Sequence, residues 1–237
     1  MRRRLSTLTI IAAGFSLAAT ATTTAKTKEK KESKEDPVAR GRYLVSFGGC
    51  NDCHTPWVFN KELGMPVPDH ARFLSGHPVG APEPTAKLDP KTDLGVIGAT
   101  FTAFKLPFGT VYAPNLTPDQ ETGIGNWSEQ MFLDVFHKGT HLGADGRPVL
   151  PPMPWQEIRN MTDDDLKAVF AFLKTIPAVH NPVADPKVPK PVLDGMLKVL
   201  PTELAMLDAM KAGKPLPASA AAPPAPASAA PAAPAKK

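Results

Sequence analysis

The feature that most constrains this chain is a pair of cysteines three positions apart with a histidine directly after them. Cys50, Cys53 and His54 form the pattern C-x-x-C-H, which is typical of covalent haem attachment. Cysteines at this spacing at the end of a helix can reach the two vinyl groups of one porphyrin, while the adjacent imidazole binds the iron from the same side. The pattern therefore predicts one covalently bound haem c, with His54 as an axial ligand of the iron.

The cysteine pair has two competing interpretations, and the surrounding sequence supports neither. A dithiol redox site of the thioredoxin kind requires a strand before the cysteines, whereas a helical pattern precedes Cys50. A zinc site requires a second pair of ligands at suitable spacing, and the chain has 2 cysteines in all. Haem attachment is favoured over both.

Haem iron in an electron carrier usually has a second protein ligand, and a thioether raises the reduction potential relative to a second imidazole. Met153 lies in the segment Leu-Pro-Pro-Met-Pro-Trp at residues 150–155, where three prolines hold the backbone extended. A rigid loop that presents one sulfur atom suits ligation, so Met153 is the predicted second ligand. Met65, between a glycine and a proline, is the other candidate.

The remaining methionines and histidines have simpler interpretations. Met161 precedes the cap of a predicted helix and is expected to act as a hydrophobic staple, and Met131 is expected to pack within a helix. His137 and His141 could give ligation by two histidines, but both lie among polar residues and are predicted to be solvated. The same prediction applies to His70, His77 and His180.

Composition divides the chain into five segments. Residues 1–21 carry three arginines, an apolar stretch and a small-residue ending, which is the layout of a secretory signal peptide. Residues 22–36 alternate charges and are predicted to be a solvated linker. Residues 37–182 form the predicted haem domain, and residues 183–212 an extension with a weaker helix. Residues 213–237 are almost wholly Ala and Pro, which predicts a disordered tail.

Helical periodicity predicts several helices within residues 37–212. Helices are expected over 38–48, where Tyr43, Leu44 and Phe47 would share the apolar face, over 128–138 and 162–175, and more weakly over 202–212. Ser128 and Thr162 are the expected caps of the second and third helices, and Gly139 is the expected end of the second. Residues 56–126 contain frequent Gly and Pro, which predicts a long irregular insertion, with a short strand pair near residues 101–112.

The charge balance argues against nucleic acid as a partner. The whole chain carries a formal charge of +4. Residues 37–210 contain 15 basic and 19 acidic residues, however, so the predicted folded part has a net charge of −4. A mildly acidic domain lacks the basic surface that nucleic-acid binding needs.

Two further segments carry a family resemblance. Residues 109–119 read Gly-Thr-Val-Tyr-Ala-Pro-Asn-Leu-Thr-Pro-Asp, and residues 122–127 read Thr-Gly-Ile-Gly-Asn-Trp. Together with the haem motif and the methionine loop, they resemble class I c-type cytochromes, and more narrowly the haem domains of cytochrome subunits of periplasmic alcohol and gluconate dehydrogenases. Those subunits commonly carry three haem motifs, whereas this chain carries one.

The resemblance implies an all-α fold, a cytochrome c-like haem domain with His54 and Met153 as axial ligands. It also implies that Asn115 and Trp127 lie near the haem. Arg147 or Arg159 is expected to pair with a propionate, because a buried carboxylate needs a charged partner.

Together these features predict an exported, periplasmic electron-transfer protein that is not itself an enzyme. Its partners would be a dehydrogenase as electron donor and an oxidase or another cytochrome as acceptor. An uncleaved N-terminus or a membrane complex would also allow the protein to associate with the membrane. One alternative is a peroxidase-like haem enzyme or ligand-binding protein whose sixth coordination position is open. Another is an interaction subunit that docks on a dehydrogenase through residues 56–126.

Overall fold

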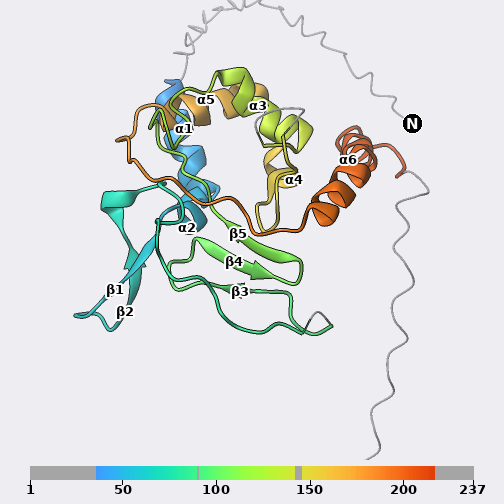
Figure 1. The fold of residues 1–237 in the computed structure, drawn as a ribbon. Helices are drawn as coiled ribbons and strands as arrows, with labels where there is room; N and C mark the ends of the chain where they lie inside the picture. Colours follow the sequence, from blue (N-terminus) through green and yellow to red (C-terminus); the bar gives the residue numbers. More distant parts are fainter. Residues whose placement is uncertain (1–35, 90, 142–145, 217–237) are drawn as a thin grey trace, which may run out of the picture. The chain divides into compact units, whose positions relative to one another are not determined.

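The computed structural model describes residues 36–89, 91–141 and 146–216 (Figure 1). The signal-peptide prediction therefore lies outside the described residues, as do nearly all of the predicted linker and tail. The described helices are α1 Pro37–Phe47, α2 Cys50–His54, α3 Glu129–Lys138, α4 Trp155–Ile158, α5 Asp163–Leu173 and α6 Lys190–Lys211.

Five short strands lie between α2 and α3. β1 (Trp57–Asn60) pairs with β2 (Met65–Pro68) in one antiparallel hairpin, and a 3₁₀ helix, His70–Arg72, follows. β3 (Val96–Ile97), β4 (Ala103–Leu106) and β5 (Gly109–Tyr112) form an antiparallel sheet in chain order.

The prediction of an all-α fold is therefore wrong, because the described part of the chain forms two small sheets besides its helices. The strands are two to four residues long, which is too short for an alternating pattern to stand out between the prolines and glycines. The expected strand pair near residues 101–112 is confirmed as β4 and β5.

Local capping signals define two of the helices as predicted. The Ser128 hydroxyl accepts a hydrogen bond from the Met131 amide, and the Thr162 hydroxyl accepts one from the Asp165 amide. Gly139 ends α3 in the left-handed conformation, with φ of 64°.

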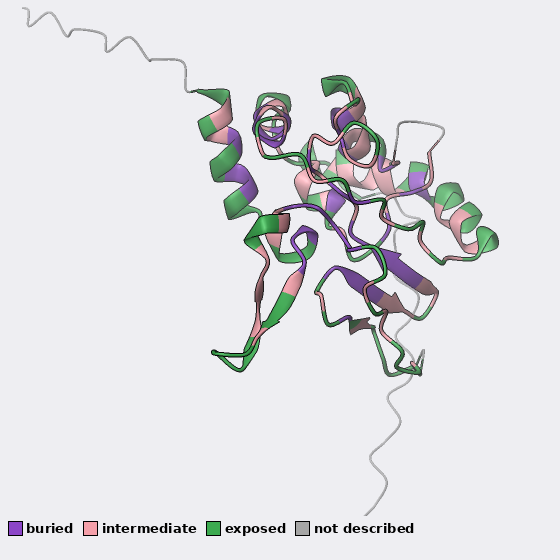
Figure 2. Ribbon diagram, turned by 60° about the vertical axis from the view of Figure 1, so that its left-hand side comes forward, coloured by how far each residue is buried: buried purple, intermediate pink, exposed green. Residues whose placement is uncertain are grey.

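Helices α1 and α5 cross in close contact, and Gly41 makes that approach geometrically feasible. A Cβ atom on Gly41 would lie 1.9 Å from the backbone oxygen of Ala168, so a larger residue has no room. The face of α1 that this crossing buries carries Gly41, Leu44 and Val45, and Figure 2 shows burial along one side of the helix. The predicted face was partly wrong, because Tyr43 and Phe47 are 56% and 78% exposed and stack on each other.

The main core joins these two helices to α3, α4 and one turn of α6. Its largest contributions come from aromatic and leucine side chains, among them Phe132, Phe136, Trp155, Leu166, Phe170 and Leu173. In the part of the chain that is described, no helix is long and apolar enough to cross a bilayer.

Helix α6 is longer than its sequence pattern predicts. It begins at Lys190 instead of near residue 202 and continues through Pro201. Proline is most common in the first turn of a helix, which is why Pro201 marks a helix start when the sequence is considered alone.

Candidate functional site

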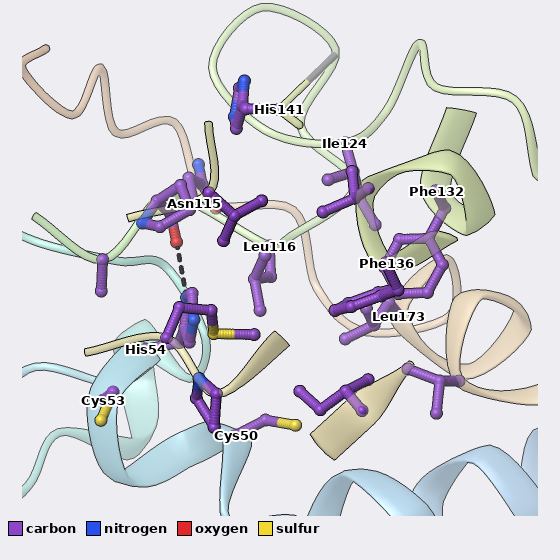
Figure 3. Close-up of a pocket in the computed structure, with 18 of the residues that line it drawn as sticks. Cys50, Cys53, His54, Asn115, Leu116, Ile124, Phe132, Phe136, His141 and Leu173 are labelled. Carbon is purple, nitrogen blue, oxygen red and sulfur yellow. Dashed lines mark hydrogen bonds between the residues drawn. The ribbon is translucent and has the colours of Figure 1, made fainter. Parts of the chain in front are cut away.

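A cavity of about 550 Å³ opens between α1, α2, α3 and α5 and the segments that follow β5 and α3. Figure 3 shows the haem-motif residues along one side of it, with apolar side chains from other elements around them. The apolar lining includes Ile124, Phe132, Phe136, Leu166, Val169 and Leu173. A cavity of this size and polarity suits a large, mainly apolar ligand.

Both cysteines line the cavity as free thiols, because they form no disulfide. Burial raises the pKa of the Cys50 thiol to about 11, and burial together with Asp52 raises the pKa of Cys53. Both groups are therefore protonated near neutral pH. This argues against a thioredoxin-type dithiol, whose attacking cysteine has a lowered pKa.

The His54 ring is buried, with 5% of its surface exposed, and it has a single backbone partner. Its Nδ1 lies 2.9 Å from the Pro114 carbonyl oxygen, and a carbonyl can only accept, so Nδ1 carries the hydrogen. Burial lowers the pKa of His54, which favours the neutral imidazole. The other ring nitrogen, Nε2, is then left with a free lone pair for a metal.

Met153 lines the same cavity from the turn that precedes α4 and is half-buried there. Met161, the predicted staple, also lines it. Met65, the alternative ligand, is 52% exposed on β2 and is absent from the described lining. The structure thus brings Met153 to the cavity and leaves Met65 on the surface.

Two histidines lie in surroundings that the sequence did not predict. His141 lines the cavity, makes an edge contact with Trp127, and burial lowers its pKa to about 4. His77 is 5% exposed, and its Nδ1 lies 2.9 Å from the Thr102 hydroxyl. Neither is solvated as predicted, because long-range packing against elements far away in sequence covers both rings.

The two arginines proposed for a propionate have different surroundings. Arg159 pairs with Asp208 at 2.8 Å, whereas Arg147 lines the cavity and, among the described residues, has no ion-pair partner within 4.0 Å. The Arg147 carbonyl accepts from the His141 amide at 2.8 Å, so a short backbone pairing holds the two residues together. Arg147 is therefore a half-buried cation at an apolar cavity, and no carboxylate of the described residues lies within ion-pair distance of it.

Asn115 and Trp127 line the cavity, but Asn115 has little capacity left for a ligand. Its amide nitrogen donates to the Thr122 hydroxyl and the Val179 carbonyl, and its oxygen accepts from the amide and hydroxyl of Thr117. With all four bonds made, Asn115 ties the loop after β5 to the segment after α5.

The described residues include no group of three or more His, Cys, Asp or Glu side chains that could hold a metal ion.

Several known proteins are similar to this chain in sequence. No family model matches the chain. Over 142 residues it is 30% identical to the cytochrome c subunit of a quinone alcohol dehydrogenase from Gluconobacter oxydans, covering 60% of this chain and 22% of the relative. The chain is similar to cytochrome c subunits of dehydrogenases. The resemblance predicted from the sequence is thus confirmed.

Two further relatives extend this similarity. A subunit of nicotinate dehydrogenase from Pseudomonas putida is 36% identical over 134 residues, which are 56% of this chain and 8% of the relative. The gluconate 2-dehydrogenase cytochrome c subunit of Pantoea cypripedii is 28% identical over 156 residues, 65% of this chain and 27% of the relative. The chain therefore spans less than a third of the length of each of these three relatives.

Proposed function

We propose that this chain is an exported c-type cytochrome that carries one covalently attached haem and passes single electrons from a dehydrogenase toward the respiratory chain. Cys50 and Cys53 would form the thioether bonds, and His54 and Met153 would be the axial ligands. The observation that carries the proposal is that all four side chains line one largely apolar cavity.

The residues present fit a haem group in four respects. Both thiols are free and protonated, which leaves them available for addition to vinyl groups. His54 is neutral with Nε2 unprotonated, as ligation requires. The walls are mainly apolar, as a porphyrin face requires. Arg147 supplies a cation that, among the described residues, has no carboxylate within ion-pair distance, and a haem propionate would compensate it. Arg159, which is already paired, is not needed for this role.

Each residue has a defined role in this proposal. Haem supplies a one-electron iron couple when it is bound. His54 is held in orientation by the Pro114 carbonyl, so its ring cannot rotate out of the cavity without losing a buried hydrogen bond. The apolar walls exclude water and raise the relative cost of the more highly charged oxidation state.

The relatives and the sequence support the proposed partners and location. The Gluconobacter oxydans and Pantoea cypripedii relatives are named as cytochrome subunits of dehydrogenases, which supports a dehydrogenase as donor. The secretory pattern of residues 1–21 supports export to the periplasm. Residues 37–182 would be the haem domain and residues 183–212 an extension of it.

A visible spectrum of the purified holoprotein, recorded while its redox potential is stepped, tests this function. We expect a six-coordinate low-spin haem c with one redox transition and a Met-to-iron charge-transfer band in the oxidised form. Met153→Ala should abolish that band, whereas Met161→Ala should preserve it. A high-spin wild-type spectrum with rapid carbon monoxide binding would instead support an open sixth position and a peroxidase-like role.

A further inference from the structure

Helix α6 belongs to the extension beyond the proposed haem domain, yet it contacts α4, the short helix that follows Met153. In Figure 1 this helix lies beside α4, the helix that begins two residues after Met153. The contacts are apolar at the core and polar at the edge.

The apolar contact is made by one stripe of α6. Leu200 is 7% exposed within the main core, and Leu204 and Leu207 pack against that core at helical spacing. Leu200 and Trp155 lie against the same point at the end of α3, because a Cβ atom on Gly139 would be 3.0 Å from Leu200 Cδ1 and 2.7 Å from the Trp155 ring. The stripe thus reaches the end of α3 at which Trp155, the first residue of α4, also packs.

Two polar contacts join α6 to α4 and its C-terminal cap. The Gln156 amide donates to the Glu203 carboxylate at 2.8 Å, and Arg159 donates to Asp208 at 2.8 Å. The Arg159 side chain is 14% exposed and that of Asp208 is 61% exposed, so water partly screens this ion pair. Two carboxylates of α6 thus hold the side chains of Gln156 and Arg159 in place.

Helix α4 needs such support because it is only four residues long and its first turn has no side-chain cap. A single turn has almost no intrinsic stability, so its position is set by tertiary contacts. The Met153 amide bonds to the Leu150 carbonyl, and the Trp155 amide bonds to the Met153 carbonyl, so a displacement of α4 would move Met153 directly.

We propose that α6 is a positioning element for the sixth iron ligand, and that Glu203 and Asp208 clamp α4 so that the Met153 thioether stays on the iron. This inference rests on the proposed function. It assigns a role in haem ligation to the extension that follows the haem domain. A weaker clamp would raise the fraction of molecules in which Met153 has left the iron and an external ligand can enter.

The test is imidazole binding to the oxidised full-length holoprotein, followed by loss of the Met-to-iron band. Partly exposed contacts of this kind are weak, so Glu203→Ala with Asp208→Ala should tighten imidazole binding by roughly 2- to 10-fold. The matched control is Asp194→Ala, which lies on the same helix but pairs with Lys190 within α6. The control should bind imidazole like the wild type.

A purely structural role for α6 would give a different pattern. The double variant would then unfold at a lower temperature while binding imidazole like Asp194→Ala, and that result would overturn the inference. Linkage requires a reciprocal effect, so amide exchange across α6 should be faster in Met153→Ala than in the wild type. Equal exchange in both proteins would also contradict it. If instead the wild type carried no haem, or Met153→Ala kept its charge-transfer band, the proposed function would fail in its own test.

Discussion

The Nδ1 atom of His54 bonds at 2.9 Å to the carbonyl of Pro114, which lies 60 residues further along the chain. Pro114 follows β5 by two residues, and the neighbouring Ala113 carbonyl accepts from the His77 amide at 2.9 Å. The small sheet therefore fixes the carbonyl that orients the imidazole. Residues 56–126, which were predicted to be an irregular insertion, therefore contribute the hydrogen-bond acceptor that orients His54.

Gly76 tests this link between the sheet and the imidazole. Its φ is 77°, and a Cβ atom there would lie 2.5 Å from the Ala113 oxygen and 2.6 Å from the Pro114 carbonyl carbon. Gly76→Ala should therefore displace the Pro114 carbonyl, shift the reduction potential of the haem and destabilise the fold by about 1–3 kcal/mol.

Gly80→Ala provides the control for that variant. Gly80 has φ of 74° but nothing within 4 Å of its Cβ position, so it carries the backbone strain without the clash. We expect it to lose stability while keeping the wild-type potential. Equal potentials in both variants would count against a role for the Pro114 carbonyl.

Arg147 should influence the iron more strongly than Arg159 does. Removing a cation from the cavity stabilises the oxidised iron, so Arg147→Gln should lower the reduction potential by on the order of 1 kcal/mol, roughly 40 mV for a one-electron couple. Arg147→Lys keeps the charge and should restore most of the difference. Arg159→Gln removes a charge that Asp208 already offsets, and a drop as large as that of Arg147→Gln would contradict the assignment.

The crossing of α1 and α5 predicts a large stability effect at one glycine. Gly41→Ala would place a methyl group 1.9 Å from the Ala168 backbone oxygen, so the helices must separate, with a loss of about 1–3 kcal/mol or more in urea denaturation. Gly195→Ala is the matched substitution in α6, where the Cβ position is open, and it should stabilise by up to about 1 kcal/mol. Similar losses in both would show that the crossing tolerates a larger residue.

The lowered pKa of His141 predicts how the free energy of unfolding depends on pH. Its pKa falls from 6.5 to about 4 in the folded protein, chiefly through burial and then through Arg147, so the unfolded chain binds a proton first as pH decreases. The free energy of unfolding should therefore decline from about pH 6.5 toward pH 4, and less steeply in His141→Gln. A His141→Gln curve parallel to the wild type would contradict this explanation.

What the sequence predicted well depends on neighbouring residues. The caps Ser128 and Thr162 act within three residues, and Gly139 ends α3 through its own backbone conformation. Each of these features can be interpreted without knowledge of the fold.

The features that the sequence did not predict depend on contacts between residues that lie far apart in the chain. His141 resembles any polar loop histidine until the cavity wall is assembled. Arg147 and Arg159 cannot be told apart in the sequence, because their difference arises when Arg147 joins the cavity wall and Asp208 pairs with Arg159. The exposed side of α1 was misassigned because Tyr43 and Phe47 are apolar, yet the approach of α5 at Gly41 decides which face is buried. The strands require pairing that no single segment specifies.

The intact mass of the full-length protein, produced in a host with working haem-ligation machinery, tests the central claim most directly. We predict one haem attached to the wild type, resistant to acidified organic solvent, and loss of that stable attachment when Cys50 and Cys53 are both changed to serine. A wild-type protein that carries no covalent tetrapyrrole, or a double serine variant that still retains one, would contradict the account.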